Sequence, residues 1–291
     1  MPEILSSDLL LRQAKKIRAN KKLGQNFFVD LELLERIADA VDIEEGDHIV
    51  EIGPGLGFLT KVLSARASAL GVKIDAIELD RTLAEKLTKQ GIKSVNVIQA
   101  DFLDFDLASI EAERIKIVGN IPYQITSPII GKLFGELGKP SAWLSKIDRV
   151  VMTIQMEVAK RLVASPGSKA FSQLTLLKSY YFDAEILMTV PPEAFYPVPE
   201  VTSAVVFLDP LEAPPISVDN LPLMKKIISA GFKQRRKMLK NNLQFLNLDE
   251  NDYRTLFQEL NVSPHARAED LSLEKFAQLV DLLEEMDQKT G

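Results

Sequence analysis

The chain has 291 residues and a net charge of −6. Its length, with nearly half of the residues hydrophobic, is enough for one large domain or two unequal ones with a proper core. It has no cysteine and only two histidines, which excludes disulfides and thiolate nucleophiles and argues against a histidine-based metal site or a Ser-His triad, so we expect no metal. No apolar run approaches the ~18 to 20 residues that span a bilayer, and the start lacks the order of a signal peptide, so we expect a cytoplasmic protein without membrane contact.

Short apolar runs alternate with helical patterns from about residue 30 to residue 190. The apolar runs predict strands at 48–52, 73–78, 94–99, 115–119, 149–155 and 184–189, and a seventh at 202–208 after a proline-rich loop. Helical spacing of apolar residues predicts helices at 31–41 and 58–66. This alternation predicts a Rossmann-like α/β fold, in which helices cover both faces of a seven-stranded, mostly parallel sheet.

The pattern changes at DPLEAPPISVD, residues 209–219, where three prolines indicate a linker. The strand signals stop after it, and helices are predicted at 221–243, 249–260 and 271–287. The predicted organisation is a large domain at 1–209 with a basic N-terminal arm at 1–29, a linker at 210–219, and a small all-helical domain at 220–291.

A glycine-rich loop, IGPGLG, follows the first strand and leads into a helical stretch. Glycines at Gly53, Gly55 and Gly57 keep side chains out of this loop, which lets a ligand approach the backbone at the start of a helix. Nucleotides bind at such strand ends in open α/β sheets. The spacing is GxGxG and not the GxGxxG of the dinucleotide fingerprint, so a simple tight turn is the alternative.

The next two strand ends carry acidic and aromatic residues. Glu78 lies 25 residues after Gly53, where a carboxylate can accept both ribose hydroxyls of a nucleoside. Asp101 and Phe102 suit an adenine ring, because the carboxylate can accept from N6 and the aromatic ring can stack. Each alone would indicate an ordinary surface residue, but in register with the glycine loop they predict a nucleotide-type ligand.

The fourth strand ends in VGNIPYQITSP. Pro122 holds the preceding residue extended, which aims the side-chain oxygen of Asn120 and the carbonyl of Ile121 in nearby directions. Two acceptors at one point suit an exocyclic amino group, and Tyr123 offers a ring on which a base can stack. An ordinary turn is the alternative, but it does not explain the pairing with a ligand loop.

These motifs carry a resemblance to a known family. IGPGLG, IELD, ADF and NIPY, in this order, resemble the class I S-adenosylmethionine-dependent methyltransferases that act on amino nitrogens. Longer segments resemble the ribosomal RNA adenine dimethyltransferases: KKLGQNFFVD, QMEVAKRLVASPGSKAFSQL, VPPEAFYPVPEVTSAVV, FKQRRKMLKNNL and RAEDLSLEKFAQL. The resemblance covers nearly the whole chain, although Met156 and Glu200 stand where the family often carries a basic residue. The full C-terminal domain favours the small-subunit enzymes.

The resemblance implies dimethylation of adenine N6 on two adjacent adenosines near the 3′ end of 16S rRNA, in the small ribosomal subunit or its precursor, by a monomer that uses S-adenosylmethionine. The target base must leave its stack to reach the site. The implied catalytic residues are Asn120, Ile121, Pro122 and Tyr123, with Phe195 as a second stacking ring. A buried core residue is the alternative for Phe195. The implied cofactor-binding residues are Asn26, Phe28, Gly53, Gly55, Glu78, Asp101, Phe102 and Asn120.

Two basic segments indicate an RNA-binding surface on this acidic chain. Residues 9–29 contain six basic residues and no acid, and residues 220–248 contain seven and no acid. Lysines of the second segment recur at spacings of seven, four and three, which predicts one face of a helix at 221–243. The predicted RNA-binding residues are Lys21, Lys22, Lys233, Arg235, Arg236, Lys237 and Lys240. Two solvated basic helices are the alternative.

Three other functions stay open. A 23S rRNA adenine methyltransferase of the macrolide-resistance type shares NIPY. A non-catalytic RNA- or DNA-binding factor on the same fold would be expected to have lost cofactor motifs. A small-molecule N-methyltransferase would not need the basic C-terminal segment.

Overall fold

The computed structural model of the protein describes residues 5–290. Residues 1–4 and 291, which fall within the predicted domain bounds, lie outside the described residues. The chain divides into two units. Unit 1 comprises the described residues up to Leu133 together with Ser141–Ala159 and Glu185–Pro210. Unit 2 comprises Phe134–Pro140, Lys160–Ala184 and the described residues from Leu211 onward, so two segments predicted for the first domain belong with the C-terminal residues.

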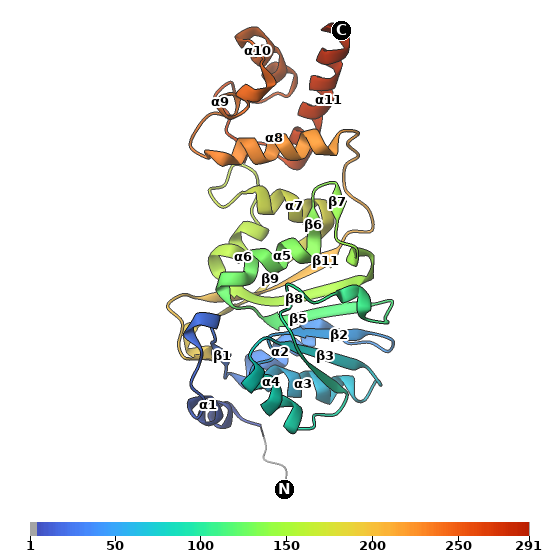
Figure 1. Cartoon of the computed structure of the whole chain (residues 1–291). Helices are drawn as coiled ribbons and strands as arrows, with labels where there is room; N and C mark the ends of the chain where they lie inside the picture. Colours follow the sequence, from blue (N-terminus) through green and yellow to red (C-terminus); the bar gives the residue numbers. More distant parts are fainter. Residues whose placement is uncertain (1–4, 291) are drawn as a thin grey trace. The chain divides into compact units, whose positions relative to one another are not determined.

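The central element is a seven-stranded sheet with the strand order β4-β3-β2-β5-β8-β11-β9 (Figure 1). Its strands are β2 (His48–Ile52), β3 (Lys73–Glu78), β4 (Val95–Gln99), β5 (Ile115–Asn120), β8 (Ile147–Gln155), β9 (Phe182–Val190) and β11 (Ser203–Pro210). The first five of these run parallel, and β11 is antiparallel to β8. All seven predicted strands are confirmed to within two residues at each end, and so is the mostly parallel α/β fold.

The helices of the first part of the chain include three that begin just after a residue whose side chain caps them. The helices of this part are α1 (Ser7–Lys15), α2 (Leu31–Val41), α3 (Phe58–Ala67), α4 (Arg81–Lys89), α5 (Thr126–Phe134) and α6 (Met156–Leu162). The side chain of Asp30 accepts from the Leu33 N–H at the start of α2, and Asp80 accepts from the N–H groups of Thr82 and Leu83 at the start of α4. The helices predicted at 31–41 and 58–66 are confirmed.

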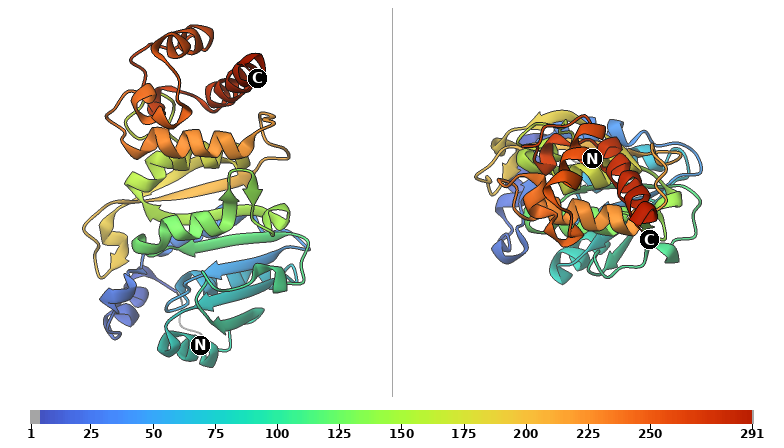
Figure 2. Two further views of the ribbon diagram at one scale, coloured as in Figure 1. Left: turned by 45° about the horizontal axis from the view of Figure 1, so that its top comes forward. Right: turned by 90° about the horizontal axis from the view of Figure 1, so that it is seen from above.

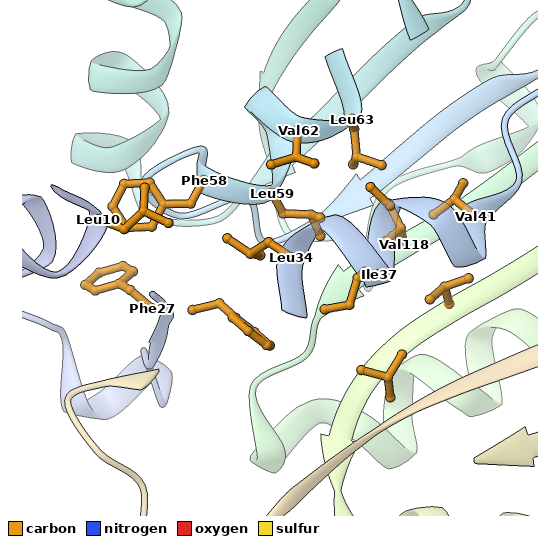
Figure 3. Packing of buried hydrophobic residues seen from close by; sticks show 14 of the residues in the cluster. Leu10, Phe27, Leu34, Ile37, Val41, Phe58, Leu59, Val62, Leu63 and Val118 are labelled. Carbon is orange, nitrogen blue, oxygen red and sulfur yellow. The ribbon is translucent and has the colours of Figure 1, made fainter. Parts of the chain in front are cut away.

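The core of unit 1 forms where α2 and α3 pack on the sheet (Figure 3). Apolar residues recur along α2 at helical spacing, which gives the helix one buried stripe: Leu34, Ile37, Ala38 and Val41. Figure 3 shows the side chains of Leu34, Ile37 and Val41 together with those of three residues of α3 and one of β5: Leu59, Val62, Leu63 and Val118. This packing fixes the parallel strands, so the residues at their carboxyl ends meet along one edge of the sheet.

Unit 2 is mainly helical, and its last helices are drawn in orange and red in Figure 2. Its elements are the hairpin β6 (Gly135–Glu136) and β7 (Lys139–Pro140), and the helices α7 (Gln173–Tyr181), α8 (Leu221–Lys233), α9 (Leu239–Asn242), α10 (Glu250–Glu259) and α11 (Leu273–Thr290). The ring of Phe232 lies 6.3 Å from that of Phe171 and 6.4 Å from that of Phe276, measured between centroids. These aromatic contacts join α8 and α11 to the segment before α7. The two last predicted helices are confirmed.

The single helix predicted at 221–243 is wrong, because α8 ends at Lys233 and α9 begins at Leu239. The amide nitrogen of Asn242 donates to the carbonyls of Gly231, at 2.8 Å, and Gln234, at 3.2 Å. These bonds occupy carbonyl groups at the end of α8 and hold a turn in place there. The spacing of the lysines therefore does not place Lys233, Lys237 and Lys240 on one helical face.

The described residues give no sign of a membrane span or a metal cluster. No helix in the described part of the chain is long and apolar enough to cross a membrane. Nor do three or more His, Asp or Glu side chains come together there in a group that could hold a metal ion. The predicted linker contains no helix between the end of β11 and the start of α8.

Candidate active site

A pocket opens in unit 1 at the carboxyl ends of β2, β3, β4 and β5. Its wall includes nearly all the residues predicted from the strand-end motifs: Asn26, Phe28, Gly53, Gly55, Glu78, Asp101, Phe102, Asn120, Ile121, Pro122 and Tyr123. The predicted residue Lys22 also lies in the wall, whereas Phe195 does not. One segment of the sheet edge therefore combines the glycine loop, the acidic residues and the NIPY tetrad.

The glycine loop adopts the left-handed backbone that its sequence predicts. The φ angles are +65° at Gly53, +57° at Gly55 and +76° at Gly57. A Cβ atom at Gly55 would also lie 3.3 Å from the ring of Phe27, so a larger residue there would press on the N-terminal segment. At Gly53 and Gly55 the loop thus has no side chain between its backbone and the pocket, and the ring of Phe27 lies next to Gly55.

Glu78 is buried and holds the glycine loop through its carboxylate. One oxygen, Oε2, accepts from the N–H of Gly55 at 2.9 Å, and the other, Oε1, accepts from the N–H of Asp80 at 2.8 Å. Burial raises the pKa of Glu78, while these two N–H groups act in the opposite direction. Each carboxylate oxygen retains a further lone pair, so the group can still accept from two hydroxyls.

Asp101 is held by the loop that follows β4. Its Oδ1 accepts from the N–H of Leu103 at 2.8 Å, and its backbone carbonyl accepts from the N–H groups of Asp104 and Phe105. No other hydrogen bond of the Asp101 side chain occurs among the described residues, so Oδ2 is available to a ligand. The adjacent Phe102 ring is 4 % exposed and lines the pocket.

The side chain of Asn120 has a fixed orientation. Its Nδ2 donates to the backbone carbonyl of Asn26 at 2.8 Å. A carbonyl oxygen only accepts hydrogen bonds, so this contact sets which end of the amide is nitrogen and leaves Oδ1 as the free acceptor. Next to it, the N–H of Ile121 donates to the carbonyl of Thr153 at 3.0 Å, which ties the tetrad to β8.

Close approach of two strands brings Asn120 to this position. A Cβ atom at Gly119 would lie 2.6 Å from the backbone carbonyl oxygen of Ile52. Contacts this short do not occur for real Cβ atoms, so a side chain at this point would force β2 and β5 apart. The glycine before Asn120 therefore keeps the tetrad near the glycine loop.

Tyr123 and Phe195 have different environments. The hydroxyl of Tyr123 forms a hydrogen bond of 2.6 Å with the hydroxyl of Ser203, which is fully buried. Phe195 is 2 % exposed, and its ring packs edge-on against Phe28 with centroids 4.7 Å apart. The short strand β10 (Phe195–Tyr196) pairs with β1 (Phe27–Phe28), which turns the Phe195 ring into the core. In this structure Phe195 is therefore a core residue beside the pocket, and its expected role as a second stacking ring stays a prediction.

The N-terminal segment forms one side of the pocket. Gln25 donates from its amide nitrogen to Oδ2 of Asp80 at 3.2 Å, and its amide oxygen accepts from the N–H of Asn20 at 2.7 Å. Six basic side chains of this segment are exposed and have no ion pair in the described part of the chain: Arg12, Lys15, Lys16, Arg18, Lys21 and Lys22. The sequence predicted a basic arm, but it did not predict that Gln25 attaches the arm to Asp80, the residue that caps α4.

The predicted RNA-binding residues of unit 2 fall into two groups. Arg235 donates to the carbonyls of Lys169 and Phe171 and to Oε2 of Glu269, and Lys240 pairs with Glu250 at 2.9 Å. The other three are Lys233, at the end of α8, and Arg236 and Lys237, in the turn after it; they are exposed and form no ion pair within the described residues. Only the second group is free to contact a phosphate without breaking a contact within the protein.

Among the pocket residues that the sequence did not predict, Glu51 and Leu79 have the most unusual environments. Glu51 is 2 % exposed, and its Oε2 has no hydrogen-bond partner among the described residues. Leu79 lines the pocket and is 44 % exposed, which is unusual for a large apolar side chain. An acid inside the apolar strand HIVEI, two residues before Gly53, was the available signal for Glu51. A buried carboxylate oxygen that faces a pocket without a partner suits a cationic ligand group.

Glu51 should make the ligand-free protein less stable as the pH rises. Burial raises the pKa of Glu51 to about 8, and the charge of nearby Glu78 acts in the same direction. A raised folded-state pKa stabilises the protein fully below the unfolded value near 4.5, and this contribution is lost as the pH rises to about 8. Glu51→Gln removes the effect, so its advantage in unfolding free energy should grow by about 1.4 kcal/mol per pH unit in this window.

Thermal melts of both proteins from pH 5 to pH 9 test this expectation. The difference in melting temperature between Glu51→Gln and the parent should increase up to about pH 8 and then level off. A constant difference over the whole range would show that Glu51 titrates at an ordinary pKa.

The chain is similar to ribosomal RNA methyltransferases in sequence and in fold. The family model for ribosomal RNA adenine dimethylase matches residues 16–285. Relatives called ribosomal RNA small subunit methyltransferase A are 39 % identical in Nostoc sp., covering 92 % of this chain and 98 % of the relative, and 40 % identical in Acaryochloris marina, covering 91 % and 97 %. The structure of the 23S rRNA methyltransferase ErmE is 25 % identical, with a TM-score of 0.68 and coverage of 89 % of this chain and 100 % of that one. A dimethyladenosine transferase from Plasmodium falciparum, at 24 % identity with a TM-score of 0.67 and coverage of 89 % and 96 %, shares the fold.

Proposed function

The chain belongs to the ribosomal RNA adenine dimethylase family, and we propose that it transfers methyl groups from S-adenosylmethionine to N6 of two adjacent adenosines near the 3′ end of 16S rRNA. The substrate is the small ribosomal subunit or its precursor, and the enzyme acts in the cytoplasm as a monomer. The observation that supports this most is the Asn120 amide, which the Asn26 carbonyl holds with its oxygen free at the pocket.

The pocket residues fit the parts of S-adenosylmethionine. The unpaired Oε2 of Glu51 suits the ammonium group, and Glu78 suits the two ribose hydroxyls. Asp101 would accept from the adenine amino group, and Phe102 would contact its ring. The backbone at Gly53 and Gly55 lies beside the methionine end, and Asn26 and Phe28 cover it. When bound, this cofactor supplies a methyl group on a sulfonium, which is a good electrophile.

The tetrad prepares the target amine. The lone pair of adenine N6 is delocalised into the ring, which makes the nitrogen a poor nucleophile. Oδ1 of Asn120 and the carbonyl of Ile121 would each accept one N6 hydrogen, holding the nitrogen in line and favouring a pyramidal geometry. Asn120 is neutral, so it orients the amine without taking its proton. Tyr123, fixed by Ser203, offers the face on which the extruded base stacks.

Labelled methyl transfer tests the proposed activity. Small subunits that lack this modification should accept labelled methyl groups, and nucleoside analysis should recover N6,N6-dimethyladenosine. Primer extension on each rRNA separates this activity from that of a 23S enzyme, because after treatment with a 23S enzyme the extension would stop only on the large-subunit RNA. Absence of transfer to either RNA, with the cofactor bound, would favour a non-catalytic binding factor.

The exposed basic residues of unit 2 should contact phosphates. Each lost phosphate contact should flatten the salt dependence of binding by about 0.7–0.9 in log K against log[salt]. The double change Arg236→Ala with Lys237→Ala should therefore reduce the slope for small-subunit binding by between about one and two units. Cofactor affinity should not change, because the pocket lies in unit 1.

Arg235→Ala is the matched control for this experiment. Its guanidinium is bound to two carbonyls and to Glu269, so its loss should lower the melting temperature of the protein and leave the salt slope nearly unchanged. A double variant whose slope equals that of the parent would mean that this turn is only a solvated surface.

A further inference from the structure

Lys132, on α5, holds the loop that carries Asp101 and Phe102. Its ammonium donates to the backbone carbonyls of Leu103, at 2.8 Å, and Phe105, at 2.6 Å. It also lies 5.6 Å from the centroid of the Phe102 ring and 5.1 Å from that of Trp143. One cation thus contacts two carbonyls and one aromatic ring of the loop, and also the only tryptophan of the chain.

These contacts complement the bonds inside the loop. Asp101 accepts through its side chain and its carbonyl from the N–H groups of Leu103, Asp104 and Phe105. The carbonyls of Leu103 and Phe105 take no part in these bonds, and Lys132 donates to both of them. Removal of the ammonium leaves these carbonyls without this donor and frees the ring of Phe102 from its cation.

The charge environment keeps the ammonium in this place. Burial lowers the pKa of Lys132, and the carboxylates of Asp104, Asp106 and Asp101 act in the opposite direction. The loop therefore surrounds Lys132 with negative charge and carbonyl dipoles. In addition, a single 3-10 turn, Tyr123–Ile125, joins the NIPY tetrad to the start of α5, so the helix that carries Lys132 is close in sequence to the target-amine residues.

We propose that Lys132 is a positioning residue that fixes Asp101 and Phe102 for the adenine ring of the cofactor and so sets the selectivity of the pocket for adenine. The proposal rests on the proposed function, because it takes the adenine of S-adenosylmethionine as the ligand. A purely structural role would change stability or weaken all ligands equally. A positioning role would act on the contact between Asp101 and the adenine amino group.

Calorimetric titration of Lys132→Met tests the proposal with two ligands, S-adenosylhomocysteine and S-inosylhomocysteine. The inosine compound has a carbonyl in place of the amino group, so it lacks the donor for Asp101. We expect the parent protein to prefer the adenosine compound by about tenfold or more, as one hydrogen bond to a carboxylate provides. Lys132→Met should weaken binding of that compound by about tenfold and reduce the preference to nearly one.

Lys146→Met is the control, because Lys146 also donates to a backbone carbonyl, that of Ile110, outside the pocket wall. It should preserve the preference, and Lys132→Arg should restore part of it through its own donors. If Lys132→Met does not fold, Lys132→Gln replaces it. Trp143 fluorescence gives a second readout, since its response to S-adenosylhomocysteine should be lost in Lys132→Met.

Two results would overturn the proposal. An unchanged preference in a folded Lys132→Met protein, or an equal loss of affinity for both ligands, would leave Lys132 a structural residue. Failure of the proposed function looks different: if the cofactor assignment fails, the parent protein binds neither compound, and if only the rRNA assignment fails, the parent keeps its preference for the adenosine compound but transfers no methyl group to small subunits.

Discussion

Replacement of Asn120 by alanine should reduce turnover by roughly 10² or more while most of the cofactor affinity remains. The free Oδ1 of Asn120 is the side-chain acceptor that we assign to the target amine, and alanine removes it. Ile121 would still offer its carbonyl, so the amine would be held at one point and could rotate. Single-turnover methylation of small subunits, with calorimetry of S-adenosylhomocysteine, separates the two quantities.

Two further variants separate the acceptor from the contact with the N-terminal segment. Asn120→Asp keeps an acceptor oxygen but cannot donate to the carbonyl of Asn26, so it should lose the fixed orientation. Asn26→Ala keeps that carbonyl, because it belongs to the backbone, and loses the side-chain bond to Gly24 and the side chain's cover over the cofactor, so it is compared at saturating S-adenosylmethionine. It should retain far more activity than either Asn120 variant. Nearly normal single-turnover rates in Asn120→Ala would remove Asn120 from the mechanism.

Loss of the Glu78 carboxylate should have the largest effect on cofactor binding. Two ribose hydrogen bonds to a carboxylate contribute at most roughly 1.5–3 kcal/mol each. Glu78→Ala also removes the acceptor for the N–H groups of Gly55 and Asp80, which should loosen the glycine loop. We therefore expect the dissociation constant for S-adenosylhomocysteine to rise by about 100-fold or more.

Calorimetry against two reference variants checks this expectation. Glu78→Gln must turn an amide NH₂ toward one of the two N–H groups, so it should bind more weakly than the parent but better than alanine. Glu85→Gln, on the exposed surface of α4, removes an acid that pairs with Arg81 and should leave the affinity unchanged. An unaltered dissociation constant in Glu78→Ala would reject the ribose assignment.

Local patterns predicted the sheet well because each strand is marked in the sequence itself. HIVEI and KIDAIE are apolar runs that end at glycines or acids, and β2 and β3 have the predicted bounds. The helix predicted at 221–243 ends early, at Lys233, and the side chain of Asn242 on the following helix α9 binds carbonyls at its end. Periodicity describes residues along one element, and it does not register a bond that returns from the next helix.

The same limit applies to the site. The strand-end motifs predicted most of the pocket wall because parallel strands bring their carboxyl ends together. The environments of Phe195 and Arg235 depend on partners far away in the chain: Phe28 for the former, and Phe171 and Glu269 for the latter. The family resemblance suggested stacking for Phe195, and the density of basic residues suggested phosphate binding for Arg235. Pairing across the fold buries Phe195 against Phe28 and ties Arg235 to its own unit, and neither contact is visible in the local sequence.

The bond between Asn120 and Asn26 has a consequence for the timing of successive transfers. Residues 22–28 form part of the pocket wall, and Gln25 ties them to Asp80, so exchange of a spent cofactor past this side requires the segment to swing out. The same movement withdraws the Asn26 carbonyl and lets the Asn120 amide rotate. During every exchange the enzyme would then lack the fixed Asn120 acceptor, and a singly methylated adenosine would receive its second methyl group only after the segment has closed again.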